Sequence, residues 1–448
     1  MSEILQIFRA ALAAVDPFQL ACENLCRHGN GLFAGPLRLA LDDFSDLVVV
    51  GAGKAAAGMG LAAESALGGR ISAGLLVLPP GGRTPFRILA QAHAAHPTPD
   101  EEGERAAGGI LAMLQKADAR TLVLCLISGG ASSLLALPAP GLTIADKGAV
   151  TALLLAAGAT IEELNAVRKH LSSVKGGRLA AAAFPATVLT LLLSDVSGDP
   201  PSVIGSGPTS PDAATFADAW AVVEKYGLQN RIPATARAFL ERGAAGLEEE
   251  TVKPGDPRLA RSFHIVIGGN ARALAGAQAK ANAMGLKADV AASPVQGEAR
   301  IAALSLAAAA LKAQAGLDPG ERCCLLSGGE TTVRVRGPGR GGRNQELALA
   351  FALAITGNPG IEMLSAGSDG LDGPTDAAGA IVDGHTVERA AGFGLDAAAF
   401  LNDNASYSFF SELERRSGDR RHVKTGPTGT NVMDLQVILL ERLPSRSI

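Results

Sequence analysis

The chain has 448 residues, enough for two or three domains of ordinary size. Hydrophobic residues make up 47% of it and charged residues 19%, which is the content of a folded protein and excludes a disordered one. The net charge is −4 and aromatic residues make up 4%, so nucleic acid is not an expected partner. Glycine is in excess, with 54 residues where average usage predicts about 30.

The beginning of the chain does not have the pattern of a signal peptide. Residues 1–17 carry the charged residues Glu3 and Arg9, and their apolar residues recur with helical periodicity. The apolar stretch 149–161 is too short and too rich in Ala and Gly to cross a bilayer. The odd number of cysteines, five, favours a reducing compartment. We therefore expect a cytoplasmic protein with no membrane partner.

Apolar runs that end in glycine or serine recur along the chain, each followed by a stretch rich in Ala and Leu. They are 47–50, 122–127, 188–193, 264–267, 323–326 and 362–364. Unbroken apolar runs are typical of strands buried on both faces, and their alternation with helices predicts an α/β fold with largely parallel sheets. Ligands of such folds bind beyond the carboxyl ends of the strands.

A charge run with two prolines at 248–257 predicts a domain boundary, although a surface loop inside one domain is the alternative. We expect two Rossmann-like domains, 1–247 and 258–448, with the active site in the cleft between them. The first helix can pack across this boundary.

The first strand leads into Gly51, Gly53 and Lys54, which formally fit the dinucleotide fingerprint G-x-G-x-x-A. The acid that this fingerprint requires is missing after the next strand, which weakens NAD binding and leaves NADP open through Arg83. A cation such as Lys54 in the first turn of a helix opposes the helix dipole, and a bound anion removes that conflict. We predict that Lys54 binds phosphate or carboxylate; a solvated surface lysine is the alternative.

Two further segments of the first half carry potential anion donors. The loop Ser128, Gly129 and Gly130 can form an anion-binding nest, or simply a tight turn. In the basic segment 165–178, helical spacing would place Arg168 and Lys175 on one face that could hold an anionic substrate, although a solvated helix face gives the same pattern.

Carboxylates follow two of the predicted strands: Asp195 in the first half, and Asp369 with Asp372 in the second. Carboxylates among glycines and hydroxyls suit Mg²⁺ or a general base, and helix caps and turns are the alternative. Arg340 and Arg343 stand among four glycines before an evident helix, which favours anion recognition. Basic groups for phosphate and acids for Mg²⁺ are the components that phosphoryl transfer requires.

Taken together, the motifs resemble the glycerate 2-kinase family, whose C-terminal part is the MOFRL domain, here about 320–440. The motifs that carry the resemblance are GAGKAAAGM, HPTPD, SGGASSLL, NAVRKHLSSVKGGRLA, LLLSDVSGDPPSVIGSGPTSPD, LLSGGETTVRVRG, GRGGRNQELALA, SAGSDGLDGPTDAAGAIVD and TGPTGTNVMDL. Small departures from the family pattern are Ala131 and Met433.

The resemblance implies phosphorylation of D-glycerate at its 2-hydroxyl by ATP with Mg²⁺. It implies that Lys54 and Arg343 are catalytic or bind phosphate, and that Asp195 and Asp369 are the acids of the LSDVSGD and SDGxDG motifs. The complete set of predicted site residues, by role, is: catalytic Lys54, Arg343 and Asp195; substrate-binding Ser128, Gly129, Gly130, Arg168 and Lys175; nucleotide-binding Gly51, Gly53, Ser327, Gly328, Gly329, Asp369, Thr428 and Asn431; metal-binding Asp195, Asp369 and Asp372.

Two alternatives stay open. Some family members are called hydroxypyruvate reductases, which would need an NAD(P)H site, and a non-catalytic protein that binds a nucleotide or a sugar acid would use the same charged loops. A homodimer is also left open.

Overall fold

The computed structural model describes residues 2–444, and the chain forms two compact units. The N-terminal unit is Pro17–Ile267, and the C-terminal unit combines Met1–Asp16 with Gly268–Ile448. The α/β class is confirmed. The division differs from the predicted boundary, because it falls after Ile267 and because the first 16 residues join the C-terminal half.

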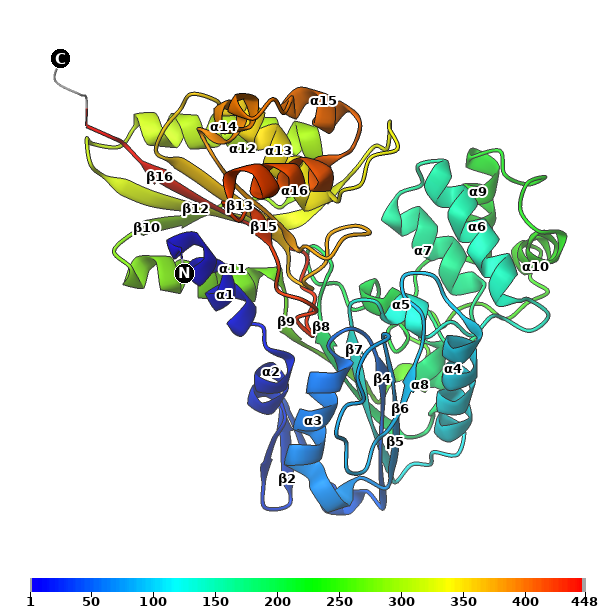
Figure 1. Cartoon of the computed structure of the whole chain (residues 1–448). Helices are drawn as coiled ribbons and strands as arrows, with labels where there is room; N and C mark the ends of the chain where they lie inside the picture. The colour runs from blue at the N-terminus through cyan, green and yellow to red at the C-terminus, as the bar shows by residue number, and fades with distance from the viewer. Residues whose placement is uncertain (1, 445–448) are drawn as a thin grey trace. The chain divides into compact units, whose positions relative to one another are not determined.

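The N-terminal unit is built on a six-stranded sheet with the order β6-β5-β4-β7-β8-β9 (Figure 1). Its strands are β4 (Asp46–Ala52), β5 (Ala73–Leu78), β6 (Ala90–His93), β7 (Thr121–Ser128), β8 (Thr187–Leu193) and β9 (Ser262–Gly268). The pairs from β6 through β8 are parallel. Counted along the chain the order is 3-2-1-4-5-6, so the Rossmann-like prediction is confirmed for this unit.

Strand β9 explains why the predicted boundary was wrong. Residues 248–257 do not leave the N-terminal unit, because the chain returns afterwards to add β9 to its sheet. The peptide N–H of Val188 donates to the carbonyl of Arg261 at 2.9 Å, just before β9 begins. The charged segment is therefore a surface loop inside one unit, which was the alternative interpretation.

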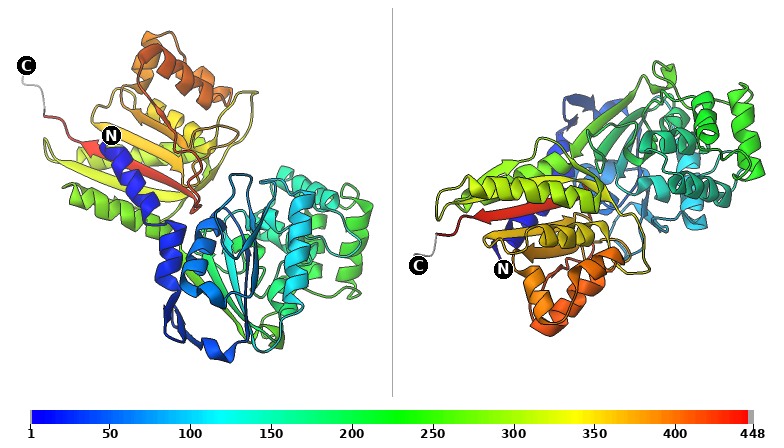
Figure 2. Two further views of the ribbon diagram at one scale, coloured as in Figure 1. Left: turned by 60° about the horizontal axis from the view of Figure 1, so that its bottom comes forward. Right: turned by 90° about the horizontal axis from the view of Figure 1, so that it is seen from above.

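Helices cover both faces of this sheet (Figures 1 and 2). They are α2 (Pro17–Asn24), α3 (Ala56–Leu67), α4 (Glu101–Leu114), α5 (Ala131–Leu134) and α8 (Arg178–Ala182). Side chains of α4 and α8 share a buried core with Val48, Val50 and Cys125 of the sheet, and α3 lies on the opposite face. A small antiparallel sheet of β1 (Cys26–His28), β2 (Gly31–Ala34) and β3 (Leu37–Ala40) precedes β4.

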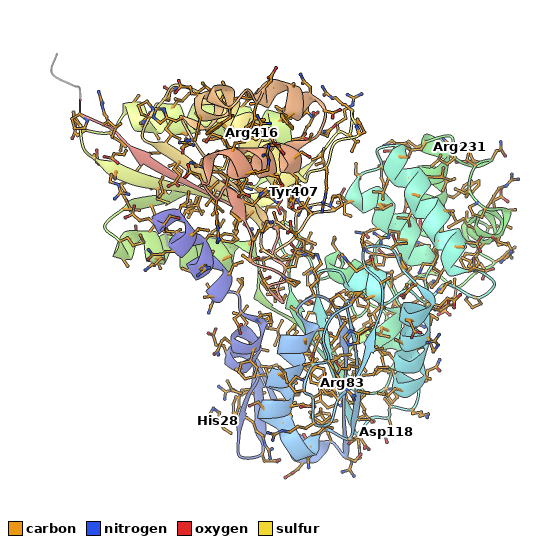
Figure 3. The ribbon with its side chains drawn as sticks, in the orientation of Figure 1. His28, Arg83, Asp118, Arg231, Tyr407 and Arg416 are labelled. Atoms are coloured by element: carbon orange, nitrogen blue, oxygen red, sulfur yellow. The ribbon has the colours of Figure 1, made fainter. Side chains whose placement is uncertain are left out.

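A four-helix group forms a second core in the N-terminal unit that the sequence analysis did not separate from the sheet. It consists of α6 (Ile144–Ala156), α7 (Ile161–His170), α9 (Phe216–Lys225) and α10 (Ala234–Ala244). Its buried side chains include Leu154, Val167, Phe216 and Leu240. Figure 1 shows these helices grouped beside the end of the sheet at which α5 lies, and Figure 3 labels Arg231 among them.

The C-terminal unit contains a seven-stranded mixed sheet with the order β10-β12-β16-β13-β14-β15, and β11 also pairs with β12. Its strands are β10 (Lys287–Val290), β11 (Val295–Glu298), β12 (Arg322–Thr332), β13 (Ile361–Gly367), β14 (Gly379–Asp383), β15 (His422–Val423) and β16 (Asp434–Glu441). The prediction of a largely parallel sheet is wrong here. Strand β16 inserts antiparallel between β12 and β13, a pairing of distant segments that no local pattern indicates.

The helices of the C-terminal unit lie on both faces of that sheet (Figure 2). They are α1 (Glu3–Ala13), α11 (Asn270–Ala283), α12 (Ala299–Ala315), α13 (Arg343–Ala354), α14 (Thr386–Gly392), α15 (Ala397–Asn402) and α16 (Ser406–Ser417). Helix α1 packs on α11 and also contacts β16 and β13, and its Ile4, Ile7 and Phe8 are buried, which explains why it belongs to this unit.

No helix within residues 2–444 is by itself long and apolar enough to span a membrane. Helices α1 and α2 meet those criteria only when the two are counted together as a bent pair.

Candidate functional site

The first group of predicted site residues meets at the carboxyl ends of β4 and β7. The two strands are neighbours in the sheet, but the chain goes from β4 to β5 on one side and from β7 to β8 on the other. Doubly wound folds bind their ligands at the point where the strand order reverses in this way. The peptide N–H of Lys54 donates to the carbonyl of Gly129 at 2.8 Å, and that of Ala55 donates to Ser128 Oγ at 3.0 Å. The structure thus joins the Lys54 loop to the Ser128–Gly130 loop.

The two glycines of the fingerprint-like sequence have a packing explanation. A Cβ atom on Gly51 would lie 2.1 Å from the carbonyl oxygen of Leu126, and one on Gly53 would lie 2.1 Å from Ser128 Oγ. Gly53 also has a φ of +133°, which residues other than glycine rarely adopt. The close approach of β7 therefore requires both glycines, and their spacing alone does not indicate a dinucleotide.

His96 lies beside this junction, and the sequence analysis assigned it no role. A Cβ atom on Gly130 would lie 3.1 Å from His96 Nε2 and 3.6 Å from Lys54 Cγ. Asp100 holds the His96 loop, because its carboxylate accepts hydrogen bonds from the peptide N–H groups of Ala95 and Gly103, both at 2.9 Å. The HPTPD motif, quoted among those that carry the family resemblance, was the available signal.

The basic segment does not form the predicted helical face. Helix α7 ends at His170, so Arg168 lies within it and Lys175 lies beyond it. Lys175 is nevertheless brought to the β7 loop, since its Nζ donates to the carbonyl of Ser132 at 2.6 Å and to its Oγ at 2.9 Å. Ser132 Oγ in turn is 2.9 Å from Ser206 Oγ.

Asp195 follows β8, the strand next to β7, at the same carboxyl edge of the sheet. It is half-buried and comes directly after the fully buried Ser194, whose Oγ accepts a hydrogen bond from the peptide N–H of Val196. The N-terminal unit therefore places Lys54, the Ser128 loop, Lys175 and Asp195 along one edge.

The centre of the second group is an ion pair between Arg343 and Asp434. Arg343 is the first residue of α13, and its Nε and Nη2 donate to the two carboxylate oxygens of Asp434 at 2.5 and 2.8 Å. Its Nη1 lies 3.2 Å from Glu330 Oε1. Burial lowers the pKa of Arg343, but the hydrogen bonds and charge of Asp434, with smaller contributions from Glu330 and Asp372, raise it overall.

Asp434 was not among the predicted site residues, although it lies within the quoted motif TGPTGTNVMDL. It opens β16 opposite Gly329 of β12 and opposite Gly367, the last residue of β13. Because both neighbours run antiparallel to β16, only their tertiary pairing brings an acid to this edge, where its side chain is 1% exposed.

A cavity of about 470 Å³ opens beside Arg343. Its walls are supplied by the end of β12 and the residues after it, the glycine-rich segment before α13, the first turn of α13, and two other loops. They include Glu330, Thr332, Val333, Val335, Gly341, Gly342, Glu346, Gly373, Pro374 and Asn404. Arg340 does not line it. Its guanidinium stacks over the ring of Tyr407, 4.6 Å from the centroid, and its Nε donates to the carbonyl of Pro374 (Tyr407 is labelled in Figure 3).

Asp372 binds the start of helix α13, so the structure assigns it a role other than metal binding. Its Oδ1 accepts from the peptide N–H of Asn344 at 3.0 Å, and its Oδ2 from the peptide and side-chain N–H groups of Gln345, both at 2.9 Å. These bonds satisfy N–H groups that lack partners inside the helix. Burial raises the pKa of Asp372 to about 6; the hydrogen bonds to Asn344 and Gln345 oppose this and the charge of Asp434 adds to it.

This pKa predicts a pH-dependent stability. Because the folded-state pKa, about 6, lies above an ordinary value of about 3.9, the folded state binds a proton in that interval that the unfolded state does not. The contribution of Asp372 is therefore full below about pH 4 and is lost as the pH rises through 6. We expect the stability deficit of Asp372→Asn to grow by roughly 2–3 kcal/mol between pH 7.5 and 4.

Thermal unfolding midpoints of both proteins, measured across that pH range, test this expectation. A deficit that does not change with pH would contradict it. In the same variant the Mg²⁺ concentration for half-maximal activity should stay within twofold of wild type, whereas loss of a metal ligand would raise it strongly.

The remaining predicted nucleotide-binding residues fall into two sets. Asp369 and Thr428 are joined, since the peptide N–H of Thr428 donates to the carbonyl of Asp369 at 3.1 Å, and Asn431 follows in the same loop. Ser327, Gly328 and Gly329 do not form the predicted loop at a strand end. Strand β12 continues through them to Thr332, because β16 and β11 supply pairing partners along its length.

Arg83, the residue that left NADP open, is exposed on the loop between β5 and β6 (Figure 3). The residues that follow β5 contain no acid, as the sequence analysis had noted.

Comparisons with known proteins identify the family of this chain. Residues 3–241 match the domain of unknown function DUF4147, and residues 323–434 match the MOFRL family. The chain is 36% identical to the glycerate kinase of Danio rerio, over 99% of this chain and 98% of that protein. It is 40% identical to the D-glycerate 2-kinase of Thermotoga maritima, over 88% and 90% of the two chains.

A putative hydroxypyruvate reductase of Agrobacterium vitis is 41% identical, over 97% of this chain and 93% of the relative. The crystal structure of glycerate kinase from Thermotoga maritima superimposes with a TM-score of 0.81 at 36% identity, covering 98% of each chain. Identity and coverage of this extent show that the chain belongs to the glycerate kinase family.

Proposed function

We propose that this protein transfers the γ-phosphoryl group of ATP to the 2-hydroxyl of D-glycerate, giving 2-phosphoglycerate and ADP. The observation that carries the proposal is Arg343, a cation anchored by an ion pair in the C-terminal unit, and Lys54 is a second cation, at a strand end of the N-terminal unit. Lys54 lies at the junction of β4 and β7, and Arg343 is held by both carboxylate oxygens of Asp434. Phosphoryl transfer depends on such fixed positive charge, because negative charge redistributes over the phosphate oxygens in the transition state.

The roles of these two cations follow from how each is held. Asp434 occupies Nε and Nη2 of Arg343 and Glu330 Oε1 lies 3.2 Å from Nη1, so the guanidinium keeps one orientation in the wall of the cavity. We assign Arg343 to the charge that develops on the transferring group. Lys54 begins the segment that leads into α3, where the helix N-terminus also favours an anion, and we assign it to phosphate as well.

For the acceptor alcohol, we propose that Asp195 accepts the proton of the 2-hydroxyl. A half-buried carboxylate at the carboxyl edge of the sheet, beside the Ser128 loop, suits a general base. The peptide N–H groups of the Ser128–Gly130 loop and the cations Arg168 and Lys175 would hold the substrate carboxylate.

The side chains present could bind Mg²⁺ only if the protein supplies few of its ligands. Within residues 2–444 no three His, Cys, Asp or Glu side chains form a metal-binding group. Mg²⁺ in kinases keeps several waters and binds one or two carboxylates together with the nucleotide phosphates, so this fits. We propose Asp195 of the N-terminal unit and Asp369 of the C-terminal unit each as a candidate ligand, and the bound ion would offset phosphate charge. Asp372 is excluded from this set, because its oxygens bind the start of α13.

One assay tests the proposal against its rivals. The purified protein is mixed with D-glycerate, Mg²⁺ and ATP, and ADP release is followed. Enolase, added to the product, converts 2-phosphoglycerate directly and so distinguishes it from the 3-phosphate. In parallel, NADH or NADPH is mixed with hydroxypyruvate. Cofactor oxidation without ADP release would favour the reductase that some relatives are named for, and no turnover in either assay would favour a binding protein.

A further inference from the structure

Three cations of the N-terminal unit gather without a counter-ion, and we call them the cation cluster: Lys147 of α6, Arg168 of α7, and Lys175 just beyond α7. Lys175 is 2% exposed, and the other two are half-buried. Within the part of the chain that the structure describes, no carboxylate forms an ion pair with any of the three. The adjacent Lys169 differs, since it pairs with Asp212 at 3.0 Å.

Hydrogen bonds fix the cluster beside the β7 loop. Lys175 uses two of its three N–H donors on Ser132, two residues after Gly130. Lys147 Nζ donates to the carbonyl of Leu137 at 3.4 Å, and the same oxygen accepts from Ser172 Oγ at 3.1 Å. Arg168 makes no side-chain hydrogen bond within residues 2–444, so all five of its donors are available there.

Three desolvated like charges are costly unless an anion joins them, because each charge has lost water and repels the others. The pKa values of both lysines are lowered by this desolvation and repulsion. Burial, then the charge of Arg168, lowers the pKa of Lys147 to about 7, with Glu104 acting in the opposite direction. Burial, then the charges of Lys147, Arg168 and Lys169, lowers the pKa of Lys175 well below its ordinary value.

We propose that the cation cluster is the carboxylate site of the acid substrate, and that Lys147, which no motif singled out, is the residue that completes it. The inference deepens the proposed function and rests on it. The 2-hydroxyl of a 2-hydroxy acid is on the carbon next to the carboxylate. A carboxylate held beside Ser132 therefore keeps the hydroxyl near the carboxyl end of β7, the edge where Lys54 lies.

The proposal has a consequence for protons. Besides Arg168 and Lys175, the charged groups around Lys147 are Glu104 of α4 and its neighbour Asp146, whose carboxylate is already engaged by Thr143 and by Thr235 of α10. A bound carboxylate would raise the pKa of the lysines. At pH 8, where Lys147 is largely neutral without ligand, binding should therefore take up protons.

Calorimetric titration of the full-length protein with D-glycerate, without nucleotide, tests the inference. We expect Lys147→Met to weaken binding roughly tenfold to a hundredfold, since a charged hydrogen-bond partner is lost. Lys147→Arg should bind within a fewfold of wild type. The control Lys116→Met, which removes an exposed lysine of the same unit, should bind as wild type does. Repeating the titration at pH 8 in two buffers of different ionisation enthalpy should reveal proton uptake that Lys147→Met reduces.

Stability separates this role from a structural one. Removing an unpaired, desolvated charge should leave the thermal unfolding midpoint of Lys147→Met unchanged or raise it, whereas a structural lysine would lower it. Titrations with glycerol and with inorganic phosphate establish the ligand class. Glycerol should not bind, and an effect of Lys147→Met on phosphate but not on D-glycerate would overturn the carboxylate assignment.

Failure of this inference can be distinguished from failure of the proposed function. Equal binding of D-glycerate by wild type and Lys147→Met, with ADP release intact, overturns the inference and leaves the proposed function standing. Absence of D-glycerate binding and of ADP release in wild type overturns both.

Discussion

Arg343→Ala should lower kcat by about three orders of magnitude or more, the scale of a lost arginine in phosphoryl transfer. The reason is geometric: Asp434 fixes the guanidinium in one orientation beside the cavity, so its charge requires no rearrangement during the reaction. Initial rates with saturating D-glycerate and ATP measure the effect. Arg343→Lys should retain part of the rate, because it keeps the charge and loses the two-pronged geometry.

The same substitution leaves the carboxylate of Asp434, 1% exposed, without its cation, which costs roughly 3–5 kcal/mol in buried pairs. Rates must therefore be compared below the unfolding midpoint of the variant. Arg421→Met is a matched control, since it breaks a partly buried pair with Asp383, 2.9 Å apart, in the same unit. It should lower stability and leave kcat within about threefold. Near-normal turnover of folded Arg343→Ala would refute the assignment.

Lys54→Met should lower kcat by about two to three orders of magnitude, comparable to removal of one preorganised donor from a transition-state site. Its backbone is fixed independently of its side chain, because the N–H group of Lys54 bonds the carbonyl of Gly129. The fold of the loop should therefore survive, and circular dichroism with the unfolding midpoint would verify it.

Arg83→Ala distinguishes this result from the reductase hypothesis. Arg83 is exposed on the β5–β6 loop and has no role in the proposed kinase, so the variant should retain ADP release within about twofold. In an NADP-dependent reductase it would instead lose affinity for the cofactor phosphate. Retention of full kinase activity by Lys54→Met would contradict the role proposed for that lysine.

Local sequence patterns predicted the strands and the loops to which we assign chemistry. Unbroken apolar runs predicted β4, β7, β8, β12 and β13, because burial on both faces of a sheet requires apolar side chains, and a similar run predicted the less buried β9. Strand-to-helix turns bring backbone N–H groups, small residues and charges together within a few positions. Lys54, Ser128, Asp195 and Arg343 could therefore be named from sequence alone.

Patterns of charged residues predicted structure and function less reliably, because one pattern can have several structural causes. The run 248–257 has the composition of a linker, yet it is a surface loop, because β9 returns to the first sheet. Asp372 lies in a segment with the composition of a metal-binding loop, yet its carboxylate binds the first turn of α13. Helix caps and metal sites both use carboxylates among glycines, so only the hydrogen-bond partners distinguish them.

The sequence by itself determined the α/β class, the glycine-bearing strand ends and most of the charged residues at them, since these depend on contacts between near neighbours in the chain. Only the tertiary structure decided the rest. Insertion of β16 between β12 and β13 brings Asp434 to Arg343, and the fold of α6 and α7 brings Lys147 to Lys175. These partners are separated by tens of residues, and their pairing depends on long-range packing that no spacing rule within one segment contains.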